Sequence, residues 1–334
     1  MSSTLRIPSS SPRARRPTVV IVCPARPEAN NGNWHTARRW SRMLQGHCRI
    51  RIVERWQGEP CDLLIALHAR RSADSLLRHA QAHPAVPRLL VLTGTDLYRD
   101  LAIDTSAQAS LDVADGLVVL QEEGLALLPP SARTRATVIH QSVPAQGHAP
   151  FHTRWLNVLM VGHLREEKDP GTFWRAAARL AGRHDIHWTQ IGRALEPRWA
   201  EGAEAVARAL PRFRWLGGLP RGQTRQHIRR ADVLVNCSRM EGGALVIAEA
   251  VRSGTPVLAS RMSGNLGMLG PDHAGYFPVG DDAALASLVA RCRDEPGFLE
   301  ALQAQGQRRA TLFEPDRERA LVLHCVGQWL GDLM

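Results

Sequence analysis

Residues 236–256 read NCSRMEGGALVIAEAVRSGTP, and this stretch decides the fold of the second half of the chain. The pattern is the end of an apolar strand, a turn at Gly242 and Gly243, an apolar helix, a cap at Gly254 and a new strand. The two glycines let the backbone approach a ligand closely, and the helix N-terminus offers unpaired N–H groups and a positive dipole end. The stretch therefore predicts an α/β domain with a phosphate site.

Glu249 interrupts the apolar run Ala244–Val251 inside this helix. An ionised carboxylate in such a setting is costly unless something donates hydrogen bonds to it. A pair of ligand hydroxyls would satisfy that need. The structural alternative is an ion pair with a nearby arginine, Arg252 or Arg261.

Lys168 is the only lysine among the 42 lysines and arginines of the chain. It follows an apolar run, residues 156–161, that reads as a buried strand, and strand ends bind ligands in α/β proteins. A lysine is a compact point charge, whereas an arginine is a flat fork, so a lysine kept here suggests a position where arginine would fail. The alternative is a surface lysine without a role.

Outward from these motifs, apolar runs alternate with helical patterns along the whole chain, which is typical of parallel strands joined by crossover helices. We expect strands at 18–23, 49–53, 63–67, 88–92, 117–120 and 136–139, and again at 156–161, 186–191, 213–216, 233–236 and 256–259. The predicted fold is therefore α/β, with two doubly wound, Rossmann-like domains facing each other across a cleft. The expected divisions are a disordered basic tail (1–17), a first domain (18–150), a second domain (151–313) and a C-terminal segment (314–334) whose helix crosses back to the first domain.

Composition limits the class of protein. A chain of 334 residues with 44% apolar content can bury two cores, and the six cysteines are scattered as small buried hydrophobes would be. Four units of the formal net charge of +10 lie in the 17-residue tail, and no RNA-binding aromatic signature accompanies the rest, so nucleic acid is not the expected partner. No apolar run is long enough to span a bilayer or to form a secretory signal, which favours a cytoplasmic protein without stable membrane association.

Glu241 and Glu249, seven residues apart, together with Lys168 resemble a GT-B glycosyltransferase of the large retaining family 4, which uses nucleotide-activated sugars. The resemblance implies that Glu241 lies against the sugar and that Glu249 binds the nucleotide ribose. It also implies that Lys168 binds the diphosphate. The backbone amides of Gly242, Gly243, Ala244 and Leu245 would hold the sugar and diphosphate.

The family's diphosphate-binding arginine is replaced here by His163. Either His163 or the nearby Arg165 is expected to supply the missing donor. The chain has no Asp-x-Asp sequence, so the metal-dependent single-domain class is not supported and no metal or other cofactor is expected. Lysine, arginine and helix amides would then stabilise the leaving group electrostatically.

Three loops of the first domain are expected to form the acceptor side of the cleft, although each is also compatible with an ordinary turn. They are 23–33, 68–72 and 93–96. His68 joins Lys168 and Glu241 as a candidate catalytic residue. The candidate acceptor-binding residues are Arg26, Asn31, Gly32, Asn33, Arg70, Arg71, Thr95 and Asp96.

In these loops the chain resembles a narrower group, the selenosugar synthase of selenoneine biosynthesis. That resemblance implies transfer from a UDP-sugar, UDP-N-acetylglucosamine or UDP-glucose, to selenophosphate, with formation of a carbon–selenium bond. Forked guanidiniums suit a compact oxyanion, and an anionic selenium needs positioning and charge screening but no strong general base. Retention and inversion at the sugar both remain open.

Two other interpretations stay open. An ordinary family 4 enzyme would glycosylate a hydroxyl group and would need a general acid or base, for which Asp96 or His68 could serve. A protein of a different class would bind nucleotide sugars without catalysis, or would bind nucleic acid. A Rossmann dehydrogenase is disfavoured because no GxGxxG follows the first strand.

Overall fold

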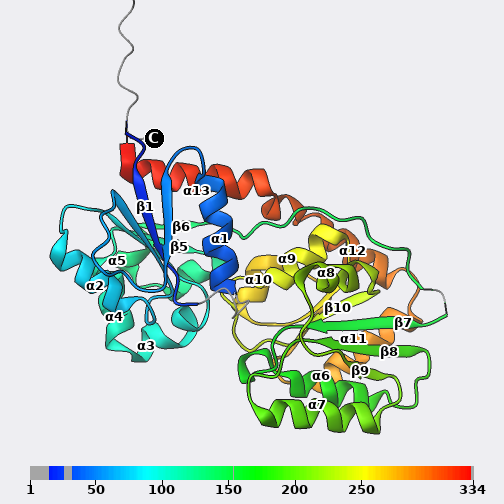
Figure 1. Ribbon diagram of the computed structural model, residues 1–334. Helices are drawn as coiled ribbons and strands as arrows, with labels where there is room; N and C mark the ends of the chain where they lie inside the picture. Colours follow the sequence, from blue (N-terminus) through cyan, green and yellow to red (C-terminus); the bar gives the residue numbers. More distant parts are fainter. Residues whose placement is uncertain (1–14, 26–31, 153, 332–334) are drawn as a thin grey trace, which may run out of the picture.

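Two six-stranded parallel sheets, one from each half of the chain, form the framework of the molecule (Figure 1). The structure is a computed structural model, and it describes residues 15–25, 32–152 and 154–331. Consecutive strands within a sheet are joined through helices that cover it, because parallel strands need a crossover connection, except across residues 54–62, which form no helix.

The first sheet has the strand order β2-β1-β3-β4-β5-β6. Its register is regular, with Val19 of β1 opposite Ile50 of β2 and Leu63 of β3. The strands are β1 (Thr18–Val22), β2 (Arg49–Val53), β3 (Leu63–Leu67), β4 (Arg88–Val91), β5 (Gly116–Val119) and β6 (Ala136–Val138).

Successive residues of β1 supply two different cores, one on each face of this sheet. Val19 and Ile21 pack with α1 and α13, whereas Val20 and Val22 pack with α2 and α4, as the alternation of side chains along a strand requires. The helices of this half are α1 (Gly32–Leu44), α2 (Ala73–Ala82), α3 (Leu101–Ile103), α4 (Thr105–Val113) and α5 (Pro130–Arg133).

The second sheet has the order β12-β11-β10-β7-β8-β9, so its first and fourth strands, β7 and β10, are neighbours at the centre. The chain therefore winds outward in both directions from this pair, which is the classic Rossmann order. The strands are β7 (Leu156–Val161), β8 (Ile186–Ile191), β9 (Phe213–Trp215), β10 (Val233–Asn236), β11 (Val257–Ser260) and β12 (Tyr276–Phe277).

The helices of the second domain also divide between the two faces of its sheet. One core, around Phe173, takes in α6, α11 and α12, and the other, around Ile247, takes in α8, α9 and α10. The helices are α6 (Pro170–Arg179), α7 (Pro197–Ala209), α8 (Arg221–Arg230), α9 (Leu245–Ser253), α10 (Ser263–Leu269), α11 (Asp282–Asp294) and α12 (Phe298–Gln307).

Every strand expected from the sequence is present, and each boundary agrees to within one residue. The strand that the sequence did not indicate is β12. It is two residues long, too short for a hydrophobic pattern, and it exists because Tyr276 and Phe277 pair with the edge of β11. The two doubly wound domains predicted from the sequence are thus confirmed.

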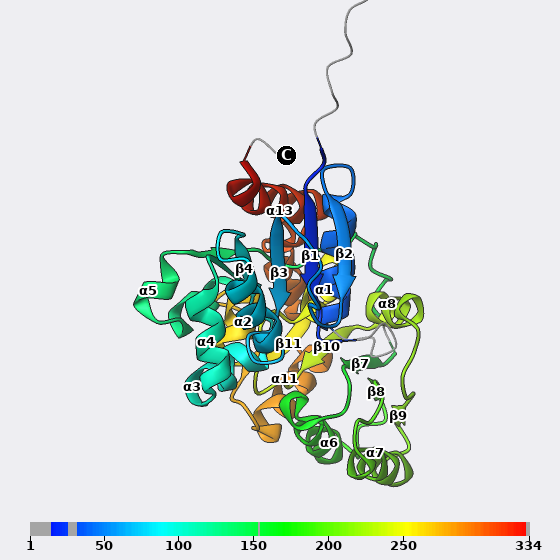
Figure 2. The ribbon, with the colours of Figure 1, turned by 60° about the vertical axis from the view of Figure 1, so that its left-hand side comes forward.

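The last helix, α13 (Pro315–Leu330), returns to the first domain and packs against α1 (Figures 1 and 2). Its anchor is Glu318, which is 1% exposed. The Glu318 carboxylate accepts hydrogen bonds from Arg39 Nε (2.7 and 2.9 Å), Trp40 Nε1 (3.0 Å) and Ser142 N (2.7 Å). These bonds join α13 to α1 and to the interdomain connection, and the three donor groups make the buried charge tolerable.

The two domains come into close contact at two glycines of the second domain. A Cβ built on Gly242 would lie 2.5 Å from the carbonyl of Thr93, and one on Gly243 would lie 2.8 Å from Leu120 Cβ. Only glycine permits these approaches. Across the same contact, Tyr98 receives a hydrogen bond from Ser263 Oγ at 3.2 Å.

Within the described parts of the chain, no helix combines the length and the apolar character that crossing a membrane would require. The tail predicted for 1–17 lies mostly outside those parts. At its end, Arg15 pairs with Asp62 at 2.6 Å.

Candidate active site between the domains

A cavity of about 610 Å³ lies between the two domains and is lined from both. The first domain contributes the start of α1 and the loops after β3 and β4. The second contributes the loops after β7, β8 and β10, the start of α8, and α9. Its lining residues are Gly32, Asn33, His35, His68, Arg71, Thr93, Gly94, Thr95, Gln141, Val161, Gly162, His163, Arg165, Lys168, Ile191, Gly192, Arg193, Gly218, Leu219, Pro220, Arg221, Thr224, Met240, Glu241, Gly242, Gly243, Leu245, Val246 and Glu249.

The position of the cavity follows from the strand order. In an open parallel sheet, the loops that leave two adjacent strands in opposite directions open a crevice at the carboxyl ends. In the second sheet these strands are β7 and β10, which carry Lys168 and Glu241 just beyond their ends. In the first sheet the corresponding pair is β1 and β3, which are followed by α1 and His68.

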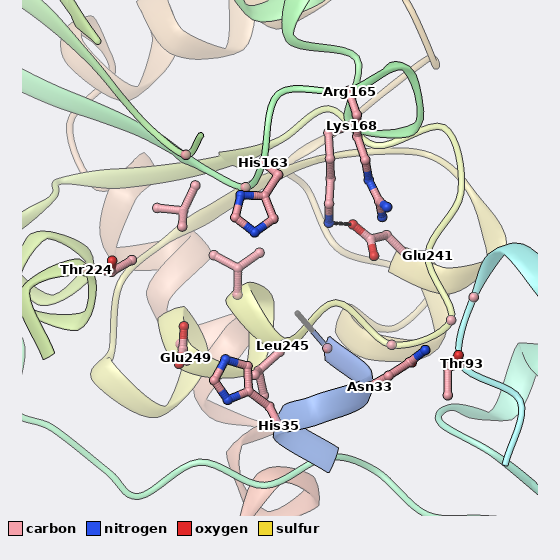
Figure 3. Close-up of a pocket in the computed structure, with 18 of the residues that line it drawn as sticks. Asn33, His35, Thr93, His163, Arg165, Lys168, Thr224, Glu241, Leu245 and Glu249 are labelled. Atoms are coloured by element: carbon pink, nitrogen blue, oxygen red, sulfur yellow. Dashed lines mark hydrogen bonds and ion pairs between the residues drawn. The ribbon is translucent and has the colours of Figure 1, made fainter. Parts of the chain in front are cut away.

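Lys168 and Glu241 form an ion pair at the centre of the cavity, between Lys168 Nζ and Glu241 Oε1 (Figure 3). Ser238 Oγ donates a second hydrogen bond to the same oxygen at 2.7 Å. Burial raises the pKa of Glu241, but the attraction and hydrogen bond of Lys168 and the hydrogen bond of Ser238 outweigh it and leave the pKa lowered. Glu241 is therefore ionised at neutral pH, and two of the three residues predicted to be catalytic lie in direct contact.

Gly162 makes room for the lysine stem. Its φ is 155°, and a Cβ there would lie 3.4 Å from Lys168 Cδ. Gly162 in turn lies directly beneath Gly192, on which a Cβ would come to 1.8 Å from the Gly162 carbonyl oxygen. A side chain at Gly192 is thus excluded, because the two loops touch through their backbones.

Glu249 lines the same cavity and is 7% exposed. Burial raises its pKa, although Arg221, Arg225 and Arg39 all oppose that shift. Arg221 NH2 approaches Glu249 Oε1 at 3.3 Å from the start of α8. The sequence analysis considered an ion pair of Glu249 with Arg252 or Arg261, and this interpretation is wrong.

Those two arginines are engaged elsewhere. Arg252 pairs with Glu314 at 3.2 Å, and Arg261 lies over the ring of Tyr276. The charge that faces Glu249 instead comes from α8, which lies before α9 in the sequence and packs beside it.

The N-terminus of α9 meets the cavity at Gly242, Gly243 and Leu245. Ala244 precedes the helix, is 2% exposed and does not line the cavity. No side chain caps this end and its first turn has no acidic residue, so its N–H groups and positive dipole end remain available to an anion.

His163 and Arg165, the two candidates for the missing family arginine, both line the cavity on the loop after β7. Arg165 Nε is 3.6 Å from Glu167 Oε2, and its charge also lowers the pKa of Glu241. Both side chains thus line the same cavity as Lys168.

Gly32 and Asn33 line the first-domain side of the cavity at the start of α1. Asn33 lies between Leu245 and Thr93 in the close-up (Figure 3). The other two candidates on this loop, Arg26 and Asn31, lie outside the described residues.

His68 lines the cavity and adopts a left-handed backbone conformation with φ of 73°. For a residue other than glycine this conformation is uncommon and is held by its surroundings. The ring is fixed because Arg71 N donates to Nδ1 at 3.4 Å and Nε2 contacts Thr95 Oγ1 at 3.0 Å. Burial lowers the pKa of His68, so the imidazole is neutral at neutral pH.

Arg71 and Thr95 line the cavity beside His68. Arg70, the next residue along the same loop, turns away from it. Arg70 Nε pairs with Asp104 Oδ2 at 3.0 Å, so an acceptor-binding role does not fit its position.

Asp96, predicted to bind the acceptor, does not line the cavity and is completely buried. Its carboxylate accepts hydrogen bonds from the backbone amides of Ala69 (3.0 Å), Thr93 (3.0 Å) and Gly94 (2.7 Å). We correct the prediction accordingly, because Asp96 ties together the loops after β3 and β4 and has no oxygen directed at a substrate.

Sequence reasoning missed His35 and Arg221. His35 points into the cavity from α1, on the side of Leu245 and Glu249 (Figure 3). Burial and the neighbouring Arg221, Arg39 and Arg38 lower its pKa to about 4, so the ring is neutral. A histidine three residues into a helix and an arginine in a basic helix carry no local signal that would single them out.

In the described parts of the chain, no group of three or more histidine, cysteine, aspartate or glutamate side chains is arranged to hold a metal ion. The expectation that the protein works without a metal stays a prediction.

Comparison with known proteins gives a family match within the second domain and relatives whose similarity extends beyond it. Residues 151–309 match the family described as Glycosyl transferases group 1. A D-inositol 3-phosphate glycosyltransferase of Thermomonospora curvata is 31% identical over 46% of this chain and 38% of its own length. A protein of the same name from Streptomyces avermitilis is 26% identical over 81% of this chain and 60% of its own length. The chain thus spans between 38% and 60% of the length of these relatives.

Solved structures share the fold at low sequence identity. Sucrose-phosphate synthase of Thermosynechococcus elongatus superposes with a TM-score of 0.77 at 18% identity, covering 94% of this chain and 99% of its own. Anabaena HepE, solved with UDP and glucose, gives 0.72 at 14% identity and covers 93% and 100%. The pneumococcal O-GlcNAc transferase GtfA, solved with UDP and GlcNAc, gives 0.63 at 17% identity and covers 81% and 57%. These similarities establish the GT-B fold expected from the sequence.

Proposed function

We propose that this protein is a glycosyltransferase that uses a UDP-sugar as donor. The observation that carries the proposal is the composition of the interdomain cavity. It combines an uncapped helix N-terminus, the Lys168–Glu241 pair and the buried Glu249 at the switch point of the second sheet. The match of residues 151–309 to a glycosyltransferase family supports it, as does the presence of UDP in structures of the same fold.

Each of these groups suits one part of the donor. The N-terminus of α9 and Lys168 would hold the diphosphate, Glu249 would accept from the ribose hydroxyls, and Glu241 would orient the sugar. As the glycosidic bond breaks, negative charge develops on the departing diphosphate. Lys168, Arg165 or His163, and the α9 amides would stabilise that charge without a metal in this proposal.

For the acceptor we propose selenophosphate. Its selenium would attack the anomeric carbon, a carbon–selenium bond would form, and the bond between that carbon and the UDP oxygen would break with its electron pair leaving on UDP. Water would then cleave the selenium–phosphorus bond and release the selenosugar and phosphate. Among the described residues, the first-domain lining contains no aspartate or glutamate, and it presents the neutral His68 and the cationic Arg71. This lining suits an anion that is already nucleophilic better than a hydroxyl that must lose a proton.

A second candidate acceptor is a hydroxyl compound that carries a phosphate. Two relatives are named for D-inositol 3-phosphate, and Arg71 could hold such a phosphate while the neutral His68 takes the hydroxyl proton. The two proposed reactions, with selenophosphate and with a hydroxyl acceptor, use the same donor site. They differ in the acceptor atom that becomes bonded to the sugar.

Mass spectrometry of the products separates these acceptors. The protein is incubated with UDP-N-acetylglucosamine or UDP-glucose and either selenophosphate or inositol 3-phosphate. We expect a selenium-containing sugar from the first acceptor. Release of UDP without such a product would overturn the selenophosphate proposal, and a glycosylated inositol phosphate would establish the second candidate.

Binding experiments test the alternatives without catalysis. A nucleotide-sugar-binding protein would bind the donor without turnover with any acceptor. A nucleic-acid-binding protein would bind duplex DNA or RNA at moderate salt and show no affinity for UDP-sugars.

Two adjacent arginines provide a matched test of the acceptor site. Arg71→Gln should raise KM for the acceptor about tenfold or more while leaving the donor Kd unchanged, because a charge-assisted contact to the oxyanion is lost. Arg70→Gln removes the same charge one residue away but on a side chain paired with Asp104 outside the cavity, and it should keep KM within about twofold. Equal effects of the two variants would contradict the assignment of Arg71.

A further inference from the structure

We infer that the Lys168–Glu241 ion pair makes the site select an intact nucleotide sugar over the nucleoside diphosphate alone. The inference rests on the proposed function, since it assumes that Lys168 receives the diphosphate and Glu241 the sugar. It goes beyond that function because it concerns how the two residues depend on each other.

Both members of the pair are largely buried. The Lys168 side chain is 16% exposed and the Glu241 side chain 11% exposed. Each is attached to a different loop, after β7 and after β10, and the two positions are 73 residues apart in the chain. Neither loop therefore dictates the contact locally, and the two side chains can separate without disturbing either strand.

Lys168 and Glu241 are hydrogen-bonded to each other in the cavity. A diphosphate that binds at the N-terminus of α9 competes with Glu241 for the ammonium of Lys168. If the ammonium moves to the phosphate, Glu241 retains Ser238 Oγ as its hydrogen-bond donor among the described residues. An enclosed carboxylate that loses its cation is strongly destabilised, so the diphosphate alone binds at a cost.

A nucleotide sugar removes this cost. Its sugar hydroxyls are hydrogen-bond donors, and they replace Lys168 as partners of the Glu241 carboxylate while the diphosphate takes the ammonium. The exchange satisfies both groups only when sugar and diphosphate arrive together. After transfer the sugar leaves, Glu241 again attracts Lys168, and the remaining UDP is weakened, which favours product release.

The test compares the Kd values of UDP and of UDP-N-acetylglucosamine or UDP-glucose by calorimetry. In Glu241→Gln the side chain keeps its shape and loses its charge. We expect UDP to bind about tenfold more tightly than to the wild type, because Lys168 no longer has to leave a carboxylate. The UDP-sugar should bind no more tightly than before. An unchanged UDP affinity would overturn the inference, since a residue that merely contacts the sugar would leave UDP unaffected.

A second background shows whether the effect passes through Lys168. In Lys168→Met, adding Glu241→Gln should change the UDP affinity by less than about twofold, because the ammonium that connects the two groups is absent. A full tenfold gain in that background would mean simple repulsion between Glu241 and the phosphates, and would overturn the inference. Glu166→Gln, exposed on the same turn as Lys168 and outside the cavity lining, is the control for a charge change alone and should leave both Kd values unchanged.

Ser238→Ala gives a prediction of opposite sign, which does not depend on how well Glu241→Gln folds. With its remaining donor removed, Glu241 suffers more when Lys168 leaves, so UDP should bind several-fold more weakly while the UDP-sugar changes less. Equal weakening of both ligands would contradict the exchange. If the wild type binds neither UDP nor the UDP-sugars, the proposed function itself fails and the inference falls with it.

Discussion

At the scale of single residues, the site contains buried charges that each require a partner of opposite charge. Lys168, Glu241 and Glu249 are all largely enclosed, and each has a partner of opposite charge: Glu241 for Lys168, and Arg221 for Glu249. Such pairs contribute little net stability, but loss of one member leaves a buried charge behind. A charged ligand that enters the cavity can therefore replace one member of such a pair as the partner of the other.

Glu249→Ala should weaken binding of the UDP-sugar by about 2 kcal/mol, roughly thirtyfold in Kd, since the ribose hydroxyls lose their hydrogen-bond acceptor. UDP should lose the same amount, because both ligands carry the ribose. Calorimetry measures both, and the unfolding temperature of the variant checks its fold. An affinity equal to that of the wild type would refute the ribose role.

Lys168→Arg keeps the charge and changes its shape. The cavity has room for a slender stem over Gly162, and a planar guanidinium cannot approach Glu241 or a diphosphate in the same geometry. We expect kcat to fall by about tenfold or more with a smaller effect on donor Kd. Steady-state kinetics decides the point, and wild-type values would mean that the lone lysine is an accident of composition.

At the scale of elements, the strand order places the chemistry. The central pair of the second sheet is β7 and β10, and the loops that leave them carry the cations Lys168 and Arg165 and the carboxylate of Glu241 into the crevice. The short α9 then adds a free helix N-terminus at the same place. Three elements that are distant in the chain thus provide ammonium, carboxylate and amide donors around one point.

Gly242→Ala tests the approach between the domains. The new methyl group would lie 2.5 Å from the carbonyl of Thr93, so the first-domain loop must move away from α9. We expect a loss of about 1–3 kcal/mol, roughly tenfold or more in kcat/KM, with far-UV circular dichroism unchanged. Gly222→Ala in α8, where a Cβ meets nothing within 4 Å, is the control and should retain full activity.

At the scale of the whole molecule, α13 and the connection between the domains hold the two halves in register. Glu318 on α13 bonds to Arg39 and Trp40 on α1 and to Ser142 on the connection. The α1 that Glu318 anchors also presents Asn33 and His35 to the cavity. The helix α13 therefore supports the first-domain wall of the cavity through α1.

Glu318→Ala should lower the free energy of unfolding by about 3 kcal/mol, because the variant leaves a largely buried guanidinium and two further donors without an acceptor. Chemical denaturation followed by circular dichroism measures the change. Asp316→Ala, an exposed position on the same helix, should stay within about 0.5 kcal/mol of the wild type. Similar effects at both positions would contradict the anchoring role.

The sequence by itself determined the strands, the two doubly wound domains and the glycine turn before α9, because each depends on local hydrophobic pattern and backbone freedom. It also singled out Lys168 as the only lysine among many arginines and Glu249 as a carboxylate in an apolar helix, whereas Glu241 was indicated by its spacing from Glu249 in the family resemblance. The short β12 could not be predicted from the sequence, because that strand exists only by pairing with β11.

Only the tertiary structure decided which charges meet. It paired Lys168 with Glu241 across 73 residues and gave Glu249 the partner Arg221 instead of Arg252 or Arg261. It turned Arg71 into the cavity and Arg70 out of it, and it used Asp96 to bind backbone amides. The physical reason is the same in each case: a side chain's electrostatic partner is set by what other elements bring within a few ångströms, and the local sequence contains no record of that.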